Sequence, residues 1–424
     1  MDNPQEQLFP APLLQDIQSR FAFVDRCPFL GSRTFLDSAS GSLRLKEIGK
    51  IMERQACIAD QINRDTPGSR HVMDTISRGE DDVRTFLGSS GTVVAALTAT
   101  AALSRTIRDA VAHFPGSNVV TTTLDHPATH DSLYRAAEVF GKEFRTADPC
   151  PATGTVQVDT ILQEIDANTS VVALIHGSNV TGAYLDAASI VRQARKINED
   201  ICVIIDGVQY APYAPVDVDE IGADVYVFAP YKTYCKKGIG FAVLSERFSH
   251  IPHDRVLEKP ANDWSLGSAD HINYAAWSAA VDYFAWLGGH FTGSDSRRER
   301  VTSAMSAIES NMTGLLDRAV NGSSAAEGLK TLEGVTLYGL EGSLAERTCV
   351  VPMNIRGMDA KEAAKIYMEQ GVVVQARKSV MSSRQLRGMQ IAEEGIVRLS
   401  AAHYTSPKSI DRFLQITAEL TGGG

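Results

Sequence analysis

The sequence predicts an α/β protein in which a large domain holds a mostly parallel sheet and a smaller α+β domain follows. Between about residues 73 and 287, short β-branched runs alternate with longer helical patterns, which is typical of right-handed βαβ units. The run CVIID at residues 202–206 is apolar up to its last residue, as in a central strand that helices cover on both faces.

The large domain contains six predicted strands, at residues 92–97, 118–123, 170–175, 201–205, 224–228 and 240–244. Helical patterns between these strands are clearest at residues 131–140 and 186–198. Apolar positions at helical spacing, with acidic residues near the start, predict a long helix at residues 295–316.

In the C-terminal part of the chain, short strand-like runs again alternate with helical patterns. Its strand-like runs lie at residues 335–338, 348–353, 371–374 and 395–400, with helical patterns at 359–369 and 407–420. We expect the stretch GSRTFLDSASGSL near the N-terminus to form a strand and a loop that pack against this module. The predicted division is an N-terminal segment at residues 1–70, a large domain at 71–290 and a small domain at 291–424.

The composition excludes several classes of function. With 51 acidic and 41 basic residues, the chain has a formal net charge of −10 and lacks the broad basic surface that nucleic-acid binding requires. No apolar run approaches the roughly 18–20 residues that cross a bilayer, and the start MDNPQEQLFPAP does not resemble a signal peptide. The six cysteines form no CxxC pair, so we expect neither a metal site nor a disulfide framework. These features predict a cytoplasmic protein with reduced thiols.

The residues that follow each predicted strand carry the chemistry, because an open α/β sheet binds its ligands at the carboxyl ends of its strands. They comprise a carboxylate, two amides, a lysine, a histidine and a turn of small residues: Asp206, Gln209, Asn179, Lys232, His126 and the turn Thr98, Ala99 and Thr100.

This set suits pyridoxal 5′-phosphate (PLP). The cofactor needs a lysine amine for its Schiff base, a carboxylate that keeps its pyridine nitrogen protonated, and a helix N-terminus for its phosphate. Lys232, Asp206 and residues 98–100 could supply these three groups. Taken singly, a loop lysine is usually solvated and a strand-end aspartate usually caps a helix or turn, but the combination is much less expected by chance.

The segment DGVQYAPYAPVDVDEIGADVYVFAPYKTYCKKGIGFAVLSER resembles the Schiff-base region of class V aminotransferases, the family of fold-type I PLP enzymes that includes cysteine desulfurases. The resemblance extends over nearly the whole chain, through FLDSASGSL, IHGSNVTGAYLD, DWSLGSADHINYAAWSAAVDYFAWLG and IVRLSAAHYTS. It implies a large domain with a seven-stranded type of sheet, a small C-terminal domain, and PLP as the cofactor.

The resemblance also implies roles for the residues at the strand ends. Lys232 would hold the cofactor and later move the proton at the substrate's α carbon, and Asp206 would pair with the pyridine nitrogen. Gln209 and Asn179 would bind the hydroxyl oxygen of the ring. Arg398 would hold the substrate carboxylate; without the family, an arginine inside a strand is more often part of a structural ion pair.

The phosphate group would be held by residues from two chains. Thr98, Ala99 and Thr100 would cradle it within one chain, while Gly267 and Ser268 would reach it from a second copy. The resemblance therefore implies a homodimer with shared active sites.

The chain departs from the family pattern in three places. Residues 372–390, VVVQARKSVMSSRQLRGMQ, lack the cysteine on which desulfurases carry sulfur, so we expect an enzyme that is not a cysteine desulfurase. Pro127 stands where many members stack a histidine on the ring; the adjacent His126 either takes over that role or only caps a turn. Ala229 and Tyr231 replace a serine and a histidine before the lysine, and of these only Tyr231 can donate to a phosphate.

The form APYK at residues 229–232 resembles that of a desulfurase-like subgroup of specialised biosynthetic enzymes. This resemblance implies a PLP enzyme that transforms an amino acid through a carbanion, by lyase-type or carbon–carbon chemistry in specialised metabolism. Arg377 and Arg384 either bind a second acidic group of the substrate or are solvated. An aminotransferase, an epimerase and an inactive PLP-fold binding protein stay as alternatives, and a second small-molecule substrate is left open. No GxGxxG follows a first strand, which argues against a nucleotide-binding oxidoreductase.

Overall fold

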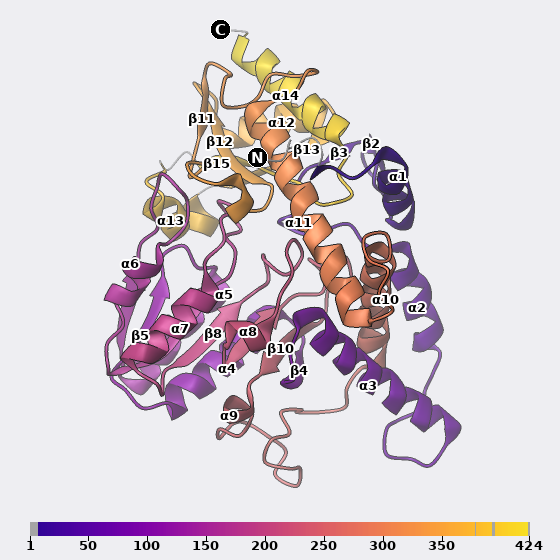
Figure 1. Cartoon of the computed structure of the whole chain (residues 1–424), viewed down its shortest axis with the longest axis vertical. Helices are drawn as coiled ribbons and strands as arrows, with labels where there is room; N and C mark the ends of the chain where they lie inside the picture. The colour runs from indigo at the N-terminus through magenta and orange to yellow at the C-terminus, as the bar shows by residue number, and fades with distance from the viewer. Residues whose placement is uncertain (1–6, 378, 392–394, 423–424) are drawn as a thin grey trace.

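One seven-stranded sheet forms the centre of the large domain in the computed structural model, which describes residues 7–377, 379–391 and 395–422 (Figure 1). Its strands are β4 (Thr92–Ala96), β5 (Asn118–Thr122), β6 (Glu143–Ala147), β7 (Thr169–Ile175), β8 (Cys202–Asp206), β9 (Val225–Phe228) and β10 (Gly240–Leu244). They lie in the order β4-β10-β9-β8-β7-β5-β6. Strands β5 to β9 pair in parallel, and only β10 runs antiparallel to its neighbours. The predicted α/β fold is confirmed.

Strand β6 is the one strand of this sheet that the sequence pattern did not predict. It lies at the edge of the sheet, and its sequence EFRTA mixes charged and apolar residues. An edge strand faces water along one side and needs no continuous apolar run, so the apolar-run criterion missed β6, although it found the more apolar edge strand β4.

Helices cover both faces of the sheet, as the alternation of side chains along the strands requires. Val119 and Val171 pack on the face that α4 (Ala99–His113) and α5 (Pro127–Phe140) cover. Their neighbours Val120 and Val172 belong to the core on the other face. That second face is covered by α3 (Pro67–Leu87), α6 (Val158–Gln163), α7 (Ala187–Ile197), α8 (Val218–Ile221), α10 (His271–Gly288) and α11 (Arg297–Asn321), while the short α9 (Glu246–Ser249) joins the first.

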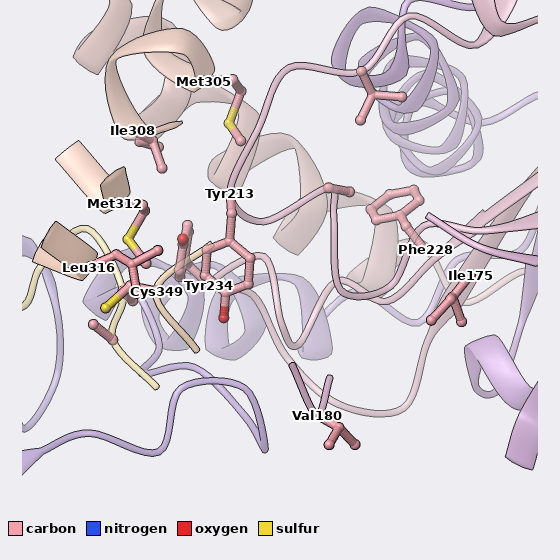
Figure 2. Close-up of a cluster of buried hydrophobic side chains, with 14 of the residues drawn as sticks. Ile175, Val180, Tyr213, Phe228, Tyr234, Met305, Ile308, Met312, Leu316 and Cys349 are labelled. Atoms are coloured by element: carbon pink, nitrogen blue, oxygen red, sulfur yellow. The ribbon is translucent and has the colours of Figure 1, made fainter. Parts of the chain in front are cut away.

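The long helix α11 lies across the junction between the large and small domains (Figure 1). Its buried residues Met305, Ile308, Met312 and Leu316 recur every three or four positions and so share one face. Figure 2 shows this face with Tyr213, Tyr234 and Cys349, which are fully buried in the same apolar cluster. The cluster joins the loop after β8 to the start of the small domain.

The small domain is built on an antiparallel sheet of β11 (Val335–Leu337), β12 (Val350–Ile355), β15 (Ile396–Ser400) and β14 (Gln375–Arg377). The helices are α12 (Ala360–Glu369), α13 (Ser379–Gly388) and α14 (Pro407–Gly422), with a short 3₁₀ turn at Leu344–Glu346. Neither β14 nor α13 was predicted. Residues 371–374 were predicted as one strand, but β13 (Val372–Val373) is separate from the four-stranded sheet.

The N-terminal residues contact this small domain. They form α1 (Ala11–Arg20), β1 (Arg26–Cys27), β2 (Gly31–Ser32), β3 (Thr34–Phe35) and α2 (Lys46–Ala56). Strand β3 pairs in parallel with β13, and the Ser38 amide donates to the Ser400 carbonyl. The exact domain boundaries stay a prediction. Within the described ranges, no helix has the length and apolarity to cross a bilayer.

Candidate active site

Most of the predicted site residues line one cavity of about 200 Å³ at the carboxyl edge of the seven-stranded sheet. The cavity lies where β4, β5, β7, β8 and β9 end, which is where a parallel sheet gathers its loops. Its predicted members are Thr98, Ala99, Thr100, His126, Asn179, Asp206, Gln209, Tyr231 and Lys232.

Lys232 reaches this cavity from a tight turn that follows β9. The turn closes with a hydrogen bond from the Lys232 amide to the Ala229 carbonyl, and the side chain is only 7% exposed. Its Nζ donates to Gln209 Oε1 at 2.8 Å. Burial, together with the positive charge of nearby Arg398, lowers the pKa of Lys232 to about 7, and the Asp206 carboxylate opposes this shift. A large share of the amine is therefore neutral near pH 7, as a nucleophile requires.

Asp206, the last residue of β8, carries a buried carboxylate that neutral donors hold in place. The Val208 amide donates to Oδ1 and the Thr129 hydroxyl donates to Oδ2, both at 3.0 Å. Within the described residues, no basic side chain forms an ion pair with this carboxylate. A protonated pyridine nitrogen would supply the missing positive partner.

Gln209 supplies a second sign that the cavity accepts a polar ligand. Its Oε1 accepts from Lys232, but its buried Nε2 has no acceptor among the residues that the structure describes. Buried donors are normally paired, because an unpaired one costs about 1–3 kcal/mol. The ring oxygen of PLP is an acceptor of the kind that this group needs.

The N-terminus of α4 forms the end of the cavity at which a phosphate would bind. Thr98 caps the helix by accepting from the Ala101 amide at 3.0 Å. Strand β10 passes so close that a Cβ on Gly240 would lie 2.2 Å from the Ala99 nitrogen. Tyr231 also lines the cavity and can donate a hydrogen bond. The positive end of a helix attracts phosphate, so the lysine, carboxylate, amide and helix terminus together fit PLP.

His126 caps a helix and also lines the cavity. Its Nδ1 accepts from the Ala128 amide at 3.1 Å and caps α5, and its ring also lines the cavity. Burial lowers its pKa, an effect that Asp206 opposes and Lys232 reinforces. Pro127 is the first residue of α5 and is not among the residues that line the cavity. A role of His126 on the ring face stays a prediction.

Arg398 lies outside the cavity lining, in an ion pair. It is fully buried in β15, and its Nη2 contacts Asp37 Oδ1 at 2.9 Å, with Ser40 and Gln375 as further acceptors. Its Nη1 donates to the Asn179 carbonyl at 2.7 Å, which ties β15 to the loop that carries Asn179. Its Nε is buried and has no acceptor among the described residues. Binding of a substrate carboxylate by Arg398 stays a prediction.

The remaining predicted residues lie at the margin of the site. Arg377, in β14, is half-buried, and burial together with nearby Arg398 lowers its pKa to about 10. Arg384 donates to the Asp125 carbonyl at 2.7 Å and contacts Asp131 at 3.0 Å, so it fastens α13 to the start of α5. Gly267 and Ser268 are exposed and lie outside the cavity of their own chain. Their contact with a second copy stays a prediction.

Two contacts of the site were missed from the sequence. Thr129 lies one helical turn after His126, and its hydroxyl donates to Asp206. Residues three apart on a helix share a face, so the spacing from the predicted site residue His126 could have indicated that Thr129 also belongs to the site. Gln385 lies in α13, which was not predicted, and its Nε2 donates to Asn179 Oδ1 at 3.1 Å. No local pattern indicated that contact across 206 positions of the sequence.

Comparisons with known proteins identify relatives of the chain. The profile of the family Aminotransferase class-V matches residues 34–252, just over half of the chain. A probable cysteine desulfurase of Xylella fastidiosa is 25% identical over 317 residues, which are 70% of this chain and 68% of that protein. A cysteine desulfurase of Yersinia pestis is 34% identical over 125 residues, 30% of each chain. The apo structure of a cysteine desulfurase from Thermococcus onnurineus NA1 shares the fold, with a TM-score of 0.80, 18% identity, and coverage of 97% of this chain and 98% of that one.

These relatives overturn one expectation. The missing cysteine in residues 372–390 suggested an enzyme that is not a cysteine desulfurase, and this was wrong, because the matching proteins are named cysteine desulfurases. The inference rested on one residue in one segment. Sulfur can also pass to a thiol on a second molecule, so the lack of that cysteine does not exclude the reaction.

The match over residues 34–252 and the cavity built around Lys232 and Asp206 lead to one conclusion: this chain belongs to the class V aminotransferase family, whose enzymes use pyridoxal 5′-phosphate.

Proposed function

We propose that this enzyme is a lyase that removes sulfur from cysteine and leaves alanine. The observation that carries the proposal is the buried Lys232 amine, which contacts Gln209 in a cavity that also contains the Asp206 carboxylate. The names of the relatives support cysteine as the substrate.

The buried amine of Lys232 suits proton transfer at the α carbon of an amino acid. Because its pKa is about 7, it can both take up and return a proton at neutral pH. Asp206 would keep the pyridine nitrogen protonated, and the Gln209 Nε2 would bind the ring oxygen. When bound, PLP supplies the electron sink for the negative charge that develops on the substrate.

Arg398 would orient the substrate through its Nε. Asp37, Ser40 and Gln375 accept from Nη2, but the Nε has no acceptor among the described residues. A substrate carboxylate could accept from the Nε, and Asn179, whose carbonyl already accepts from Nη1, would lie beside that carboxylate.

The sulfur acceptor in this proposal is a thiol on a second molecule. The balanced reaction is cysteine plus a thiol, giving alanine plus a persulfide: the substrate's carbon–sulfur bond breaks, a sulfur–sulfur bond forms, and the carbon receives a proton. All six cysteines lie in described residues; four are buried, Cys57 is exposed at the end of α2, and Cys150 is half-buried after β6.

The test is product analysis with the PLP-loaded protein, L-cysteine and dithiothreitol. We expect alanine and sulfide in equal amounts, and neither product from the Lys232→Ala variant, which removes the cofactor-holding amine. Sulfide accompanied by pyruvate in place of alanine would show elimination and contradict the proposal. Alanine formation by Lys232→Ala at the parent rate would contradict the role of the lysine.

We propose that the active unit is a homodimer. The phosphate end of the cavity is open to solvent, because Thr98 and Thr100 are exposed. Gly267 and Ser268 lie outside their own cavity, next to Leu266, which is 59% exposed. A molar mass of one chain by light scattering at working concentration would refute this arrangement, and twice that mass would support it.

A further inference from the structure

One side chain of the small domain bridges two loops of the cofactor cavity. Gln385, in α13, is 1% exposed. Its Nε2 donates to the Leu124 carbonyl, in the loop after β5, at 2.7 Å. The same nitrogen donates to Asn179 Oδ1, in the loop after β7, at 3.1 Å. An amide nitrogen carries two hydrogens, so both donors of Gln385 are used.

Neighbouring residues dock α13 independently of this amide. Arg384, the preceding residue, donates to the Asp125 carbonyl at 2.7 Å and contacts Asp131 at 3.0 Å. Leu386, the following residue, is 2% exposed and packs in the main apolar core. We therefore expect the helix to stay in place when the amide of Gln385 is removed.

The Leu124 carbonyl fixes the orientation of both amides. A carbonyl oxygen can only accept a hydrogen bond, so the atom of Gln385 beside it must be the nitrogen. That nitrogen also faces Asn179, so the atom of Asn179 beside it must be the acceptor Oδ1. The reverse orientation of Gln385 would set its oxygen against two acceptors. Its Oε1 is instead buried without a partner among the described residues, which is the smaller cost.

This orientation leaves the Asn179 amide nitrogen to face the cavity. Asn179 lines the cofactor cavity and is 7% exposed. Its backbone is held as well, because its carbonyl accepts from Arg398 Nη1 at 2.7 Å. With Oδ1 turned to Gln385, the Nδ2 has no acceptor among the described residues. Gln209 presents a second amide donor, its unpaired Nε2, to the same cavity.

We propose that Gln385 is a positioning residue for the cofactor, which holds the Asn179 amide with its nitrogen towards the ring oxygen of PLP. Two amide donors, from Asn179 and Gln209, would then bind one oxygen and stabilise its negative charge. An Asn179 amide in the reverse orientation would present its oxygen to that charge and repel it. The inference rests on the place that the proposed function gives PLP, with its ring oxygen beside Gln209.

The test is a pH titration of the absorbance of bound PLP, without substrate, in the parent and in Gln385→Leu. Leucine is similar in size but cannot donate, so it no longer fixes the Asn179 amide. A donor draws charge from the ring oxygen and so lowers the pH at which the bound cofactor loses a proton. We expect this pH to rise by about one unit in the variant, and the dissociation constant for PLP to rise by about tenfold. The ionisable side chains that line the cavity are the same in both proteins: His126, Asp206, Tyr231 and Lys232.

A double-mutant cycle shows whether Gln385 acts through Asn179. Asn179→Ala removes the positioned amide and should raise the pH of the transition by about as much as Gln385→Leu does. Adding Gln385→Leu to Asn179→Ala should then change the transition no further, because the group that it positions is gone. Additive shifts, or no shift from either single variant, would overturn the proposal.

Leu386→Ala is the matched control for the packing of α13. It removes buried apolar atoms and should lower the thermal midpoint, but it leaves both hydrogen bonds of Gln385 intact. The pH of the transition should therefore stay that of the parent, and a shift equal to that of Gln385→Leu would overturn the proposal. Because the titration contains no cysteine, its result is independent of whether the enzyme forms alanine.

Discussion

Gly240→Ala tests whether the start of α4 is the phosphate-binding end of the cofactor cavity. The added Cβ would lie 2.2 Å from the Ala99 nitrogen and 2.4 Å from the Thr98 carbonyl carbon. Ordinary contact begins at 3.4 Å, so the helix terminus and β10 must separate by about 1.2 Å. Both contacts are backbone atoms, which cannot rotate away as a flexible side chain could.

A displacement of this size should act on cofactor affinity more than on folding. Overpacking typically costs about 1–3 kcal/mol of unfolding free energy, which a domain of this size tolerates. A shift of about 1 Å in a positioned group can cost about a hundredfold in its function. We therefore expect the dissociation constant for PLP to rise by about 10–100-fold while the far-ultraviolet circular dichroism spectrum stays that of the parent.

The assay is titration of the apoprotein with PLP, followed by the absorbance of the bound cofactor. Gly293→Ala is the matched control, because a Cβ there meets nothing within 4 Å. If the dissociation constant of Gly240→Ala for PLP is within about twofold of the parent value and its thermal midpoint is unchanged, α4 does not hold the phosphate. The phosphate-binding site must then lie elsewhere.

Three further predictions follow from individual contacts. In the apoprotein the pKa of Lys232 is about 7, below its value in the unfolded chain. Burial of the charged amine therefore lowers the free energy of unfolding, and this cost is greatest below pH 7, where the amine is charged in both the folded and the unfolded state. Thermal melts should therefore show Lys232→Met more stable than the parent at pH 6, with the difference shrinking as pH rises from 7 towards 10; a constant difference would contradict this. Cys57→Ser combined with Cys150→Ser should still form alanine in dithiothreitol, and loss of alanine would show that the chain itself accepts the sulfur. Asp37→Ala should lower the unfolding free energy by about 3–5 kcal/mol in denaturant titrations, because it leaves the buried Arg398 without its counter-ion; a change below about 1 kcal/mol would contradict this.

The cofactor cavity could be predicted from the sequence because its geometry is set locally. Asp206 ends β8, and Gln209 and Lys232 follow β8 and β9 by only a few residues. The carboxyl ends of parallel strands meet at one edge of the sheet. Once the strands were located, these side chains had to converge. The position of Thr98 at the start of α4 follows in the same way from β4.

The surroundings of Arg398 could not be predicted, because its partners come from distant parts of the chain. Asp37 precedes it by 361 residues, and Gln375 lies on the neighbouring strand β14, which was not foreseen. Pairings of this kind depend on how the N-terminal residues pack against the small domain, and no periodicity encodes that packing. The contact of Gln385 with Asn179 was missed for the same reason.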